Sequence, residues 1–192
     1  MLTDSLRRAR GNAGLSLREV SKLAGIAASN LSTIENGRRD PTSATVERIA
    51  VAVGVEFLAV PLRGRVTAAG ALAAIVAAED AADPAGAYRT YLQLAADLAG
   101  ATAFERVLMT AEEPQPTTSR WRDAVAGLVE WRLQQVAGPV APWALQSSGA
   151  DAAAWQPQRT PFVLTVEIDE GLVPEPLRRR GILVEEGELE SA

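Results

Sequence analysis

Two arginines at the end of a short polar segment are the side chains in this sequence best suited to chemistry. Arg38 and Arg39 follow Gly37 and a segment, residues 27–36, that is rich in hydroxyl and amide groups. Guanidinium groups pair with phosphates, whereas hydroxyl and amide groups can hydrogen-bond to the edges of nucleotide bases. In a helix, Leu31 and Ile34 would lie on the side opposite the polar residues. The side chains expected to face a polyanion are Ala28, Ser29, Asn30, Ser32, Thr33, Asn36, Arg38 and Arg39.

The distribution of charge agrees with this interpretation. The chain of 192 residues has a formal net charge of −5. Residues 1–65 carry 10 basic and 6 acidic side chains, a net of +4, whereas residues 66–192 carry 9 basic and 18 acidic ones, a net of −9. A basic N-terminal region on an acidic remainder predicts that the N-terminal region alone meets a polyanion.

Two short helices joined by a glycine are predicted to position these side chains. Ser16 and Glu19 form a capping-box pattern at the start of residues 17–24, and Gly25 can take the left-handed conformation that ends a helix. Two helices separated by a tight glycine turn form a helix-turn-helix arrangement. The other helices predicted for this five-helix unit cover residues 4–13, 42–53 and 55–62.

Residues 2–62 resemble the helix-turn-helix domain of the phage-repressor-like family, also called the Cro/C1 or XRE family. The matching strings are LREVSKLAGI, LSTIENGRRDPT and TVERIAVAVGV. The resemblance implies a lambda-repressor-like fold that binds double-stranded DNA through its third helix. It also implies that Glu35, on the core side of that helix, forms a structural ion pair with Arg10, since a buried charge needs a partner.

The sequence departs from the family pattern at the start of the third helix. The family usually has Ser or Thr where Ala27 stands, and an alanine cap costs about 1 kcal/mol. The base-facing residues Ala28, Ser29, Ser32 and Thr33 include no Arg, Gln or Asn that could make a bidentate contact to a base. We therefore expect a homodimer, DNA shape or a partner to supply the remaining specificity.

Composition argues against an enzyme. The chain has no His and no Cys, so the commonest general base and the commonest soft metal ligands are absent. We find no phosphate-binding glycine loop, no nucleophile motif and no cluster of metal ligands, and we expect no catalytic residue, no metal and no cofactor. No apolar run is long enough for a membrane span, and no signal-peptide pattern precedes the first helix. We therefore expect a cytoplasmic protein without membrane contact.

The fold class predicted for the whole chain is mainly α. After a DNA-binding domain over residues 1–64, we expect a helical dimerisation or partner domain over 65–138. Residues 139–192 are predicted to form an irregular C-terminal segment with one or two short strands, of which FVLTVEI (162–168) is the convincing one. The acidic run 185–190 is predicted to be a solvated tail.

Three functions for the remainder stay open. The tail string PxPLRRRGILVxxxxL is similar to the ends of small bacterial proteins encoded beside nucleotidyltransferase-type toxins, which implies an antitoxin that represses its own operon. Arg178, Arg179 and Arg180 would then dock on the toxin, unless they form a solvated helix face. The alternatives are a transcription factor of the XRE type with a ligand-sensing and dimerisation domain, and, least favoured, a catalytic domain. The four tryptophans, Tyr88 and Tyr91 are expected in a core rather than around a ligand.

Overall fold

The protein folds into two compact units, residues 1–61 and 62–192. The computed structural model describes residues 2–57, 61–146, 153–160, 162 and 167–190. The described residues are mainly helical, which confirms the predicted fold class. Each unit has a hydrophobic core of its own.

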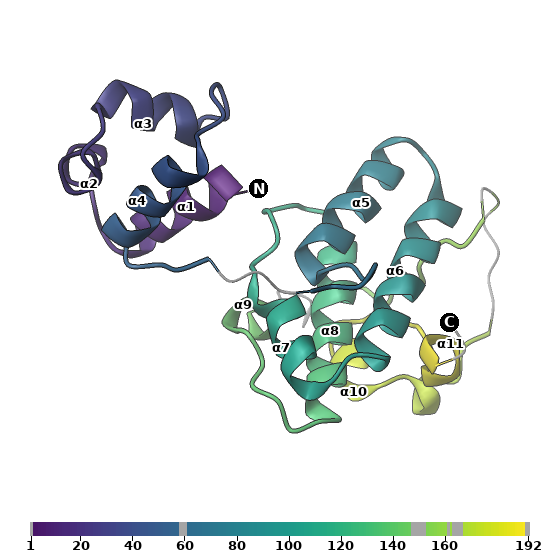
Figure 1. Cartoon of the computed structure of the whole chain (residues 1–192). Coiled ribbons are helices and arrows are strands. Elements are labelled where there is room, and N and C mark those ends of the chain that lie inside the picture. The colour runs from purple at the N-terminus through teal and green to yellow at the C-terminus, as the bar shows by residue number, and fades with distance from the viewer. Residues whose placement is uncertain (1, 58–60, 147–152, 161, 163–166, 191–192) are drawn as a thin grey trace. The chain divides into compact units, whose positions relative to one another are not determined.

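The N-terminal unit contains four helices among its described residues (Figure 1). They are α1 (Leu2–Asn12), α2 (Leu17–Ala24), α3 (Ala28–Glu35) and α4 (Ser43–Ala52). Leu6, Val20, Leu31 and Ile49 fill the core between them and are at most 1% exposed.

The predicted fifth helix is wrong where it can be checked. Val55–Phe57 and Pro61–Leu62 are not helical, and residues 58–60 lie outside the described residues. The prediction assumed that Phe57 faces inward, but this side chain is 43% exposed. Burial of an apolar face, which supplies most of the stability of a short helix, is therefore missing here.

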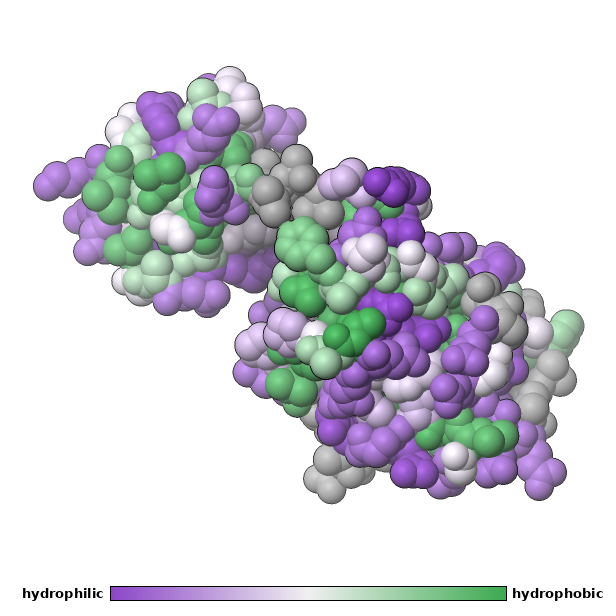
Figure 2. Space-filling view, turned by 60° about the horizontal axis from the view of Figure 1, so that its bottom comes forward, coloured by the Kyte–Doolittle hydropathy of each residue, from purple (hydrophilic) through white to green (hydrophobic). Residues whose placement is uncertain are grey.

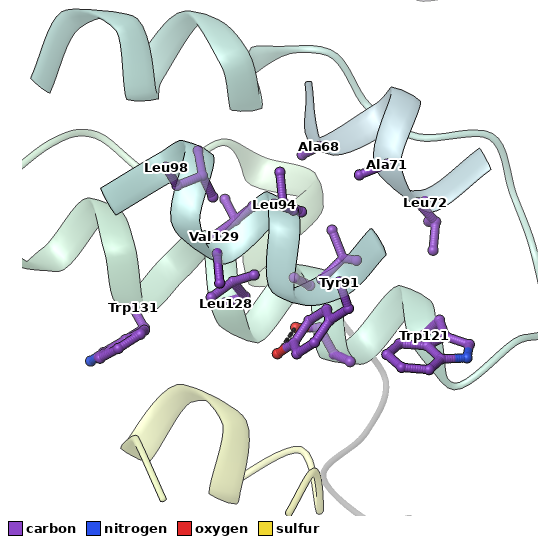
Figure 3. Packing of buried hydrophobic residues seen from close by; sticks show 14 of the residues in the cluster. Ala68, Ala71, Leu72, Tyr91, Leu94, Leu98, Trp121, Leu128, Val129 and Trp131 are labelled. Carbon is purple, nitrogen blue, oxygen red and sulfur yellow. Dashed lines mark hydrogen bonds between the residues drawn. The ribbon is translucent and has the colours of Figure 1, made fainter. Parts of the chain in front are cut away.

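The C-terminal unit is built around α8 (Trp121–Gln134). Twelve residues of α8 are buried, because other helices cover it on all sides. The longer covering helices are α5 (Ala68–Asp80), α6 (Pro84–Ala99) and α7 (Ala103–Ala111). Figure 3 shows Tyr91, Leu94 and Leu98 of α6 packed beside Leu128 and Val129 of α8.

The chain after residue 138 belongs to this same unit, whereas the sequence pattern predicted a separate irregular segment over residues 139–192. Its short helices are α9 (Pro142–Leu145), a 3-10 turn over Glu170–Leu172, α10 (Glu175–Arg178) and α11 (Glu186–Glu190). Leu177, Ile182 and Leu189 are fully buried in the shared core. Gly127 of α8 permits this packing, because a Cβ there would lie 2.6 Å from the Leu177 side chain. The buried apolar residues after residue 138 are too far apart in the sequence to show a helical period, so the sequence did not reveal most of these helices.

The predicted strand is not found in the described residues. Residues 163–166 of FVLTVEI lie outside them, and Phe162, Glu167 and Ile168 are not in a strand. The β-type pairing described in this region is a parallel bridge between Trp155 and Ile182.

The acidic end of the chain is a docked helix rather than a solvated tail. Tyr88 donates a hydrogen bond to the carboxylate of Glu188, and Arg159 pairs with the same carboxylate at 2.6 Å. Burial raises the pKa of the Tyr88 phenol, so that it stays neutral and acts as the donor. Arg132 also donates to the Leu189 carbonyl at 2.7 Å. These contacts hold α11 against the core.

Candidate nucleic-acid interface

The turn between α2 and α3 is formed by local interactions that the sequence encodes. The Ser16 amide donates to the Glu19 carboxylate at 2.7 Å, and the Glu19 amide donates to the Ser16 hydroxyl at 3.3 Å. This capping box begins α2. Gly25 ends the helix at φ +62°, and the amide of Ile26 bonds back to the Ser21 carbonyl at 3.0 Å. Glycine is common at this position because it adopts the left-handed conformation without a steric penalty.

An ion pair fixes the end of α3 against α1. Arg10 donates from Nε and Nη2 to the two carboxylate oxygens of Glu35, each at 2.8 Å. Its Nη1 also donates to the Leu15 carbonyl at 3.0 Å. The hydrogen bonds to Glu35 raise the pKa of Arg10. This is the pair that the resemblance implies, and it orients α3 rather than reaching toward a ligand.

One face of α3 is turned to the solvent. Leu31 and Ile34 are buried on the opposite face, together with Val20 and Ala24 of α2. The predicted contact residues all reach the surface. Ala28, Ser29, Asn30, Asn36, Arg38 and Arg39 are exposed, and Ser32 and Thr33 are half-buried.

Hydrogen bonds within the helix occupy part of this polar face. The Thr33 hydroxyl donates to the Asn30 main-chain carbonyl at 2.8 Å. The side-chain amide of Asn36 donates to the Ser32 main-chain carbonyl at the same distance. The Ser29 hydroxyl has no hydrogen-bond partner among the described residues. Ser29 is therefore the group on this face that is most available to a base.

The turn after α3 carries the two arginines away from the helix. Gly37 has φ +66°, and its amide bonds to the Ile34 carbonyl at 2.9 Å. The Arg38 amide bonds to the Thr33 carbonyl at 2.9 Å, which completes a Schellman motif. Arg39 donates from Nη1 to the Asn30 side-chain oxygen at 2.9 Å, so its guanidinium is held beside α3. The guanidinium of Arg38 has no hydrogen-bond or ion-pair partner in the described part of the chain.

Sequence reasoning missed Arg48 of α4. It lies with Arg39, Thr42 and Thr45 around a hollow of about 130 Å³ at the start of α4. Two guanidinium groups, two hydroxyls and a helix N-terminus are suited to a phosphate, and Asp40 is the one acidic side chain in the lining. The sequence signal that could have found Arg48 is the absence of an acidic residue one turn away on either side.

The basic N-terminal region is smaller than the sequence suggested. Residues 1–61 carry eight basic and six acidic side chains, a net of +2 rather than the +4 expected for residues 1–65. Arg65 belongs to the second unit, where it pairs with Glu105 at 3.2 Å and donates to the Gly100 carbonyl at 2.6 Å. Attraction to a polyanion should therefore depend more on where Arg38, Arg39 and Arg48 lie than on the net charge of the unit.

The predicted partner-binding arginines do not form one exposed patch. Arg180 is 2% exposed and pairs with the buried Glu130 at 2.8 Å. Arg179 reaches the same carboxylate. Arg178 is exposed and makes a long bond, 3.4 Å, to the Glu170 carbonyl. Two of the three side chains thus serve the interior, because Glu130 needs cations around it.

A four-helix unit with a glycine-turned pair and an exposed, arginine-flanked third helix defines a helix-turn-helix domain. Residues 2–57 match a family model described as a helix-turn-helix domain. The N-terminal unit is a helix-turn-helix domain of the XRE-like kind, and this domain suggests a DNA-binding regulator. Neither a search of curated proteins nor a search of solved structures found a match. None of the helices in the described residues is both long and apolar enough to span a membrane.

Proposed function

We propose that the protein is a sequence-specific regulator of transcription that places α3 in the major groove of DNA. The observation that carries this proposal is the exposed face of α3 with Arg39 held at its side by Asn30. In this pose Ser29, Ser32 and Thr33 face base edges, and Arg38, Arg39 and Arg48 bind phosphates. The arginines supply affinity, and the short polar side chains supply a modest part of the specificity.

The proposed working unit is a homodimer on a near-palindromic site. Small base-facing side chains limit what one domain can discriminate, and two domains about 34 Å apart would combine their contacts. Hydrophobic side chains reach the surface of both units (Figure 2). Phe104 at 68% and Leu172 at 55% exposure are two such residues of the second unit. A monomer mass in light scattering, with and without operator DNA, would count against the dimer.

For the C-terminal unit, we propose a sensing and dimerisation domain rather than an antitoxin arm. The tail string suggested an antitoxin, but Leu177, Ile182 and Val184 of that string are buried in the core of this unit. Their apolar character therefore needs no toxin to account for it. Co-expression with the product of the neighbouring gene separates the two: a toxic neighbour that this protein neutralises would restore the antitoxin proposal.

The DNA proposal is tested by Arg38→Ala combined with Arg39→Ala. A duplex selected from a random library by the wild-type protein serves as the ligand. Each lost phosphate contact lowers the slope of log affinity against log salt by about 0.9, so the double variant should lose a slope of up to about 2. Affinity should fall for the selected and an unrelated duplex alike.

The matched control replaces two arginines of the second unit, Arg89→Ala with Arg178→Ala. Both are exposed, and the change in net charge is the same. We expect this control to keep the wild-type slope within the error of the titration. Equal slopes for the wild type and the Arg38/Arg39 double variant would contradict the docking of α3.

A further inference from the structure

The second unit contains a cavity of about 350 Å³ beside the turn that joins α5 to α6. Its walls are the indole rings of Trp121 and Trp155 and the small residues Ala82, Pro84 and Ala87. Glu79 and Gln158 are the polar lining residues, and none of the residues that line the cavity is basic. The size falls in the range of small-molecule sites, which combine apolar walls with a few polar groups.

The aromatic wall is held in place by further rings. Trp155 packs edge-on against Trp121 with centroids 5.2 Å apart, and Tyr91 lies 5.4 Å from Trp121. Figure 3 shows Tyr91 of α6 and Trp121 at the start of α8 among the buried residues of the cluster. Rings fixed in this way present a preformed apolar surface, and the face of an indole also attracts cations.

Glu79 is a carboxylate for which the described residues provide no cation. It is exposed in the last turn of α5, followed by Asp80, and the described residues provide no hydrogen-bond or ion-pair partner for either side chain. The C-terminal end of a helix carries partial negative charge, so acidic residues there are unfavourable. This local cost leaves an uncompensated negative potential beside two indole rings.

A second hollow at this place is lined by an arginine. It measures about 410 Å³, shares Glu79 and Trp155 with the cavity, and is lined in addition by Arg120. Arg120 lies 5.7 Å from the centroid of the Trp155 ring and donates to the Ala153 carbonyl at 3.0 Å. This guanidinium is therefore tied to the main chain, and Arg120 is not among the residues that line the cavity.

We propose that this cavity binds an organic cation, an amine whose apolar ring or chain lies against the wall formed by Trp121, Trp155 and the small residues. The ammonium group would lie at Glu79, where the carboxylate and the indole faces both favour it. Binding of such a ligand would give the proposed regulator its signal. The inference rests on the proposed function only for that consequence, because the cavity belongs wholly to the second unit.

The test is a calorimetric titration of the full-length protein with three probes of similar size. Benzylamine carries the positive charge, benzyl alcohol is neutral and benzoate is negative. We expect benzylamine to bind at least about five-fold more tightly than benzyl alcohol. Benzoate should give no saturable heat. Quenching of tryptophan fluorescence by benzylamine should follow the same isotherm, because two of the four tryptophans line the cavity.

Two variants place the cation. Glu79→Gln removes the charge from the cavity and should bring benzylamine down to the affinity of benzyl alcohol. Asp80→Asn removes the same charge one residue away, at a side chain that lines only the second hollow. It should change the affinity less than about two-fold. Both side chains are exposed, so the fold should persist, and circular dichroism checks this.

Several results would overturn the inference. These are no saturable binding of benzylamine, equal or tighter binding of benzyl alcohol or benzoate, or equal effects of the two substitutions. The titration contains no DNA. A failure here therefore leaves the DNA-binding proposal standing, and a failure of the arginine variants in the DNA assay leaves this cavity unaffected.

Discussion

The two units use arginine in opposite ways. In the N-terminal unit, Arg38 and Arg39 are exposed beside α3. In the C-terminal unit, Arg106, Arg132 and Arg180 are at most 9% exposed. All three donate to main-chain carbonyls, and Arg106 alone reaches those of Ala99, Ala101 and Arg132 at 2.9–3.2 Å. Arg38 and Arg39 are thus left at the surface of the first unit, whereas these three arginines of the second unit satisfy carbonyls in its interior.

The comparison shows why a basic run is a weak signal by itself. Residues 38–39 and 178–180 look alike in the sequence, since each lies at the end of a short helix and next to a glycine. The difference comes from what lies opposite in space. A buried carboxylate, Glu130, sits 50 residues before Arg180 and receives it, whereas no acidic residue receives Arg38 in the described structure. Sequence spacing contains no trace of the first contact.

The largest effect should come from removing a buried arginine. Arg180→Ala leaves the carbonyls of Pro176 and Ala144 without their donor and takes one of two arginines from Glu130. We expect a loss of about 3 kcal/mol in the free energy of unfolding. Urea unfolding followed by tryptophan fluorescence measures it, because all four tryptophans lie in the second unit.

Arg178→Ala is the matched control for this variant. The side chain is exposed two residues away and makes one long bond, so a change within about 0.5 kcal/mol is expected. If the two substitutions cost the same, the distinction between interior and exposed arginines in this unit is wrong.

A smaller loss should follow from breaking the ion pair between Arg10 and the buried Glu35 in the N-terminal unit. Glu35→Ala removes two charge-assisted hydrogen bonds to Arg10, whose side chain is 19% exposed and can partly turn to water. We expect a loss of about 2 kcal/mol. Glu47→Ala, at an exposed site on α4, should change little.

The two units can be followed separately in this experiment. The first 61 residues contain no Trp and no Tyr, so fluorescence is silent to them, whereas far-ultraviolet circular dichroism reports both units. Glu35→Ala should shift the dichroism transition of the first unit and leave the fluorescence midpoint unchanged. A shift of the fluorescence midpoint would show that the two cores do not unfold independently.

How much the sequence could predict differs between the units for the same physical reason. The N-terminal site depends on contacts between near neighbours: Ser16 with Glu19, the left-handed Gly25 and the Schellman turn at Gly37. Such signals are visible in a string. The contact of Arg10 with Glu35 spans 25 residues and came from the family resemblance instead.

The C-terminal unit depends on distant contacts between short pieces of chain. The longer helices, α5 to α8, lie within residues 65–138, the range predicted to be helical. Most of the short helices after residue 138 were not predicted from the sequence. One or two buried side chains hold each, as Leu177 holds α10 and Leu189 holds α11. The aromatic cavity likewise brings Glu79 together with Trp155, and the distance between these residues in the sequence gives no sign of this contact.

The smallest predicted effect concerns the start of α3, which lacks the side-chain cap that begins α2 and α4. Ala27 has the extended conformation of an N-cap, φ −67° and ψ 140°, but provides no side-chain hydrogen bond. Ala27→Ser would let the hydroxyl accept from the amide of Asn30 and should stabilise the unit by about 1 kcal/mol. Ala27→Val is the control, since it fits an extended residue and adds no acceptor. Thermal unfolding by circular dichroism compares the two. Because a serine hydroxyl can also donate to a phosphate, Ala27→Ser should tighten binding to any duplex without changing base preference. Equal melting of the serine and valine variants would mean that the missing cap is not what limits this helix.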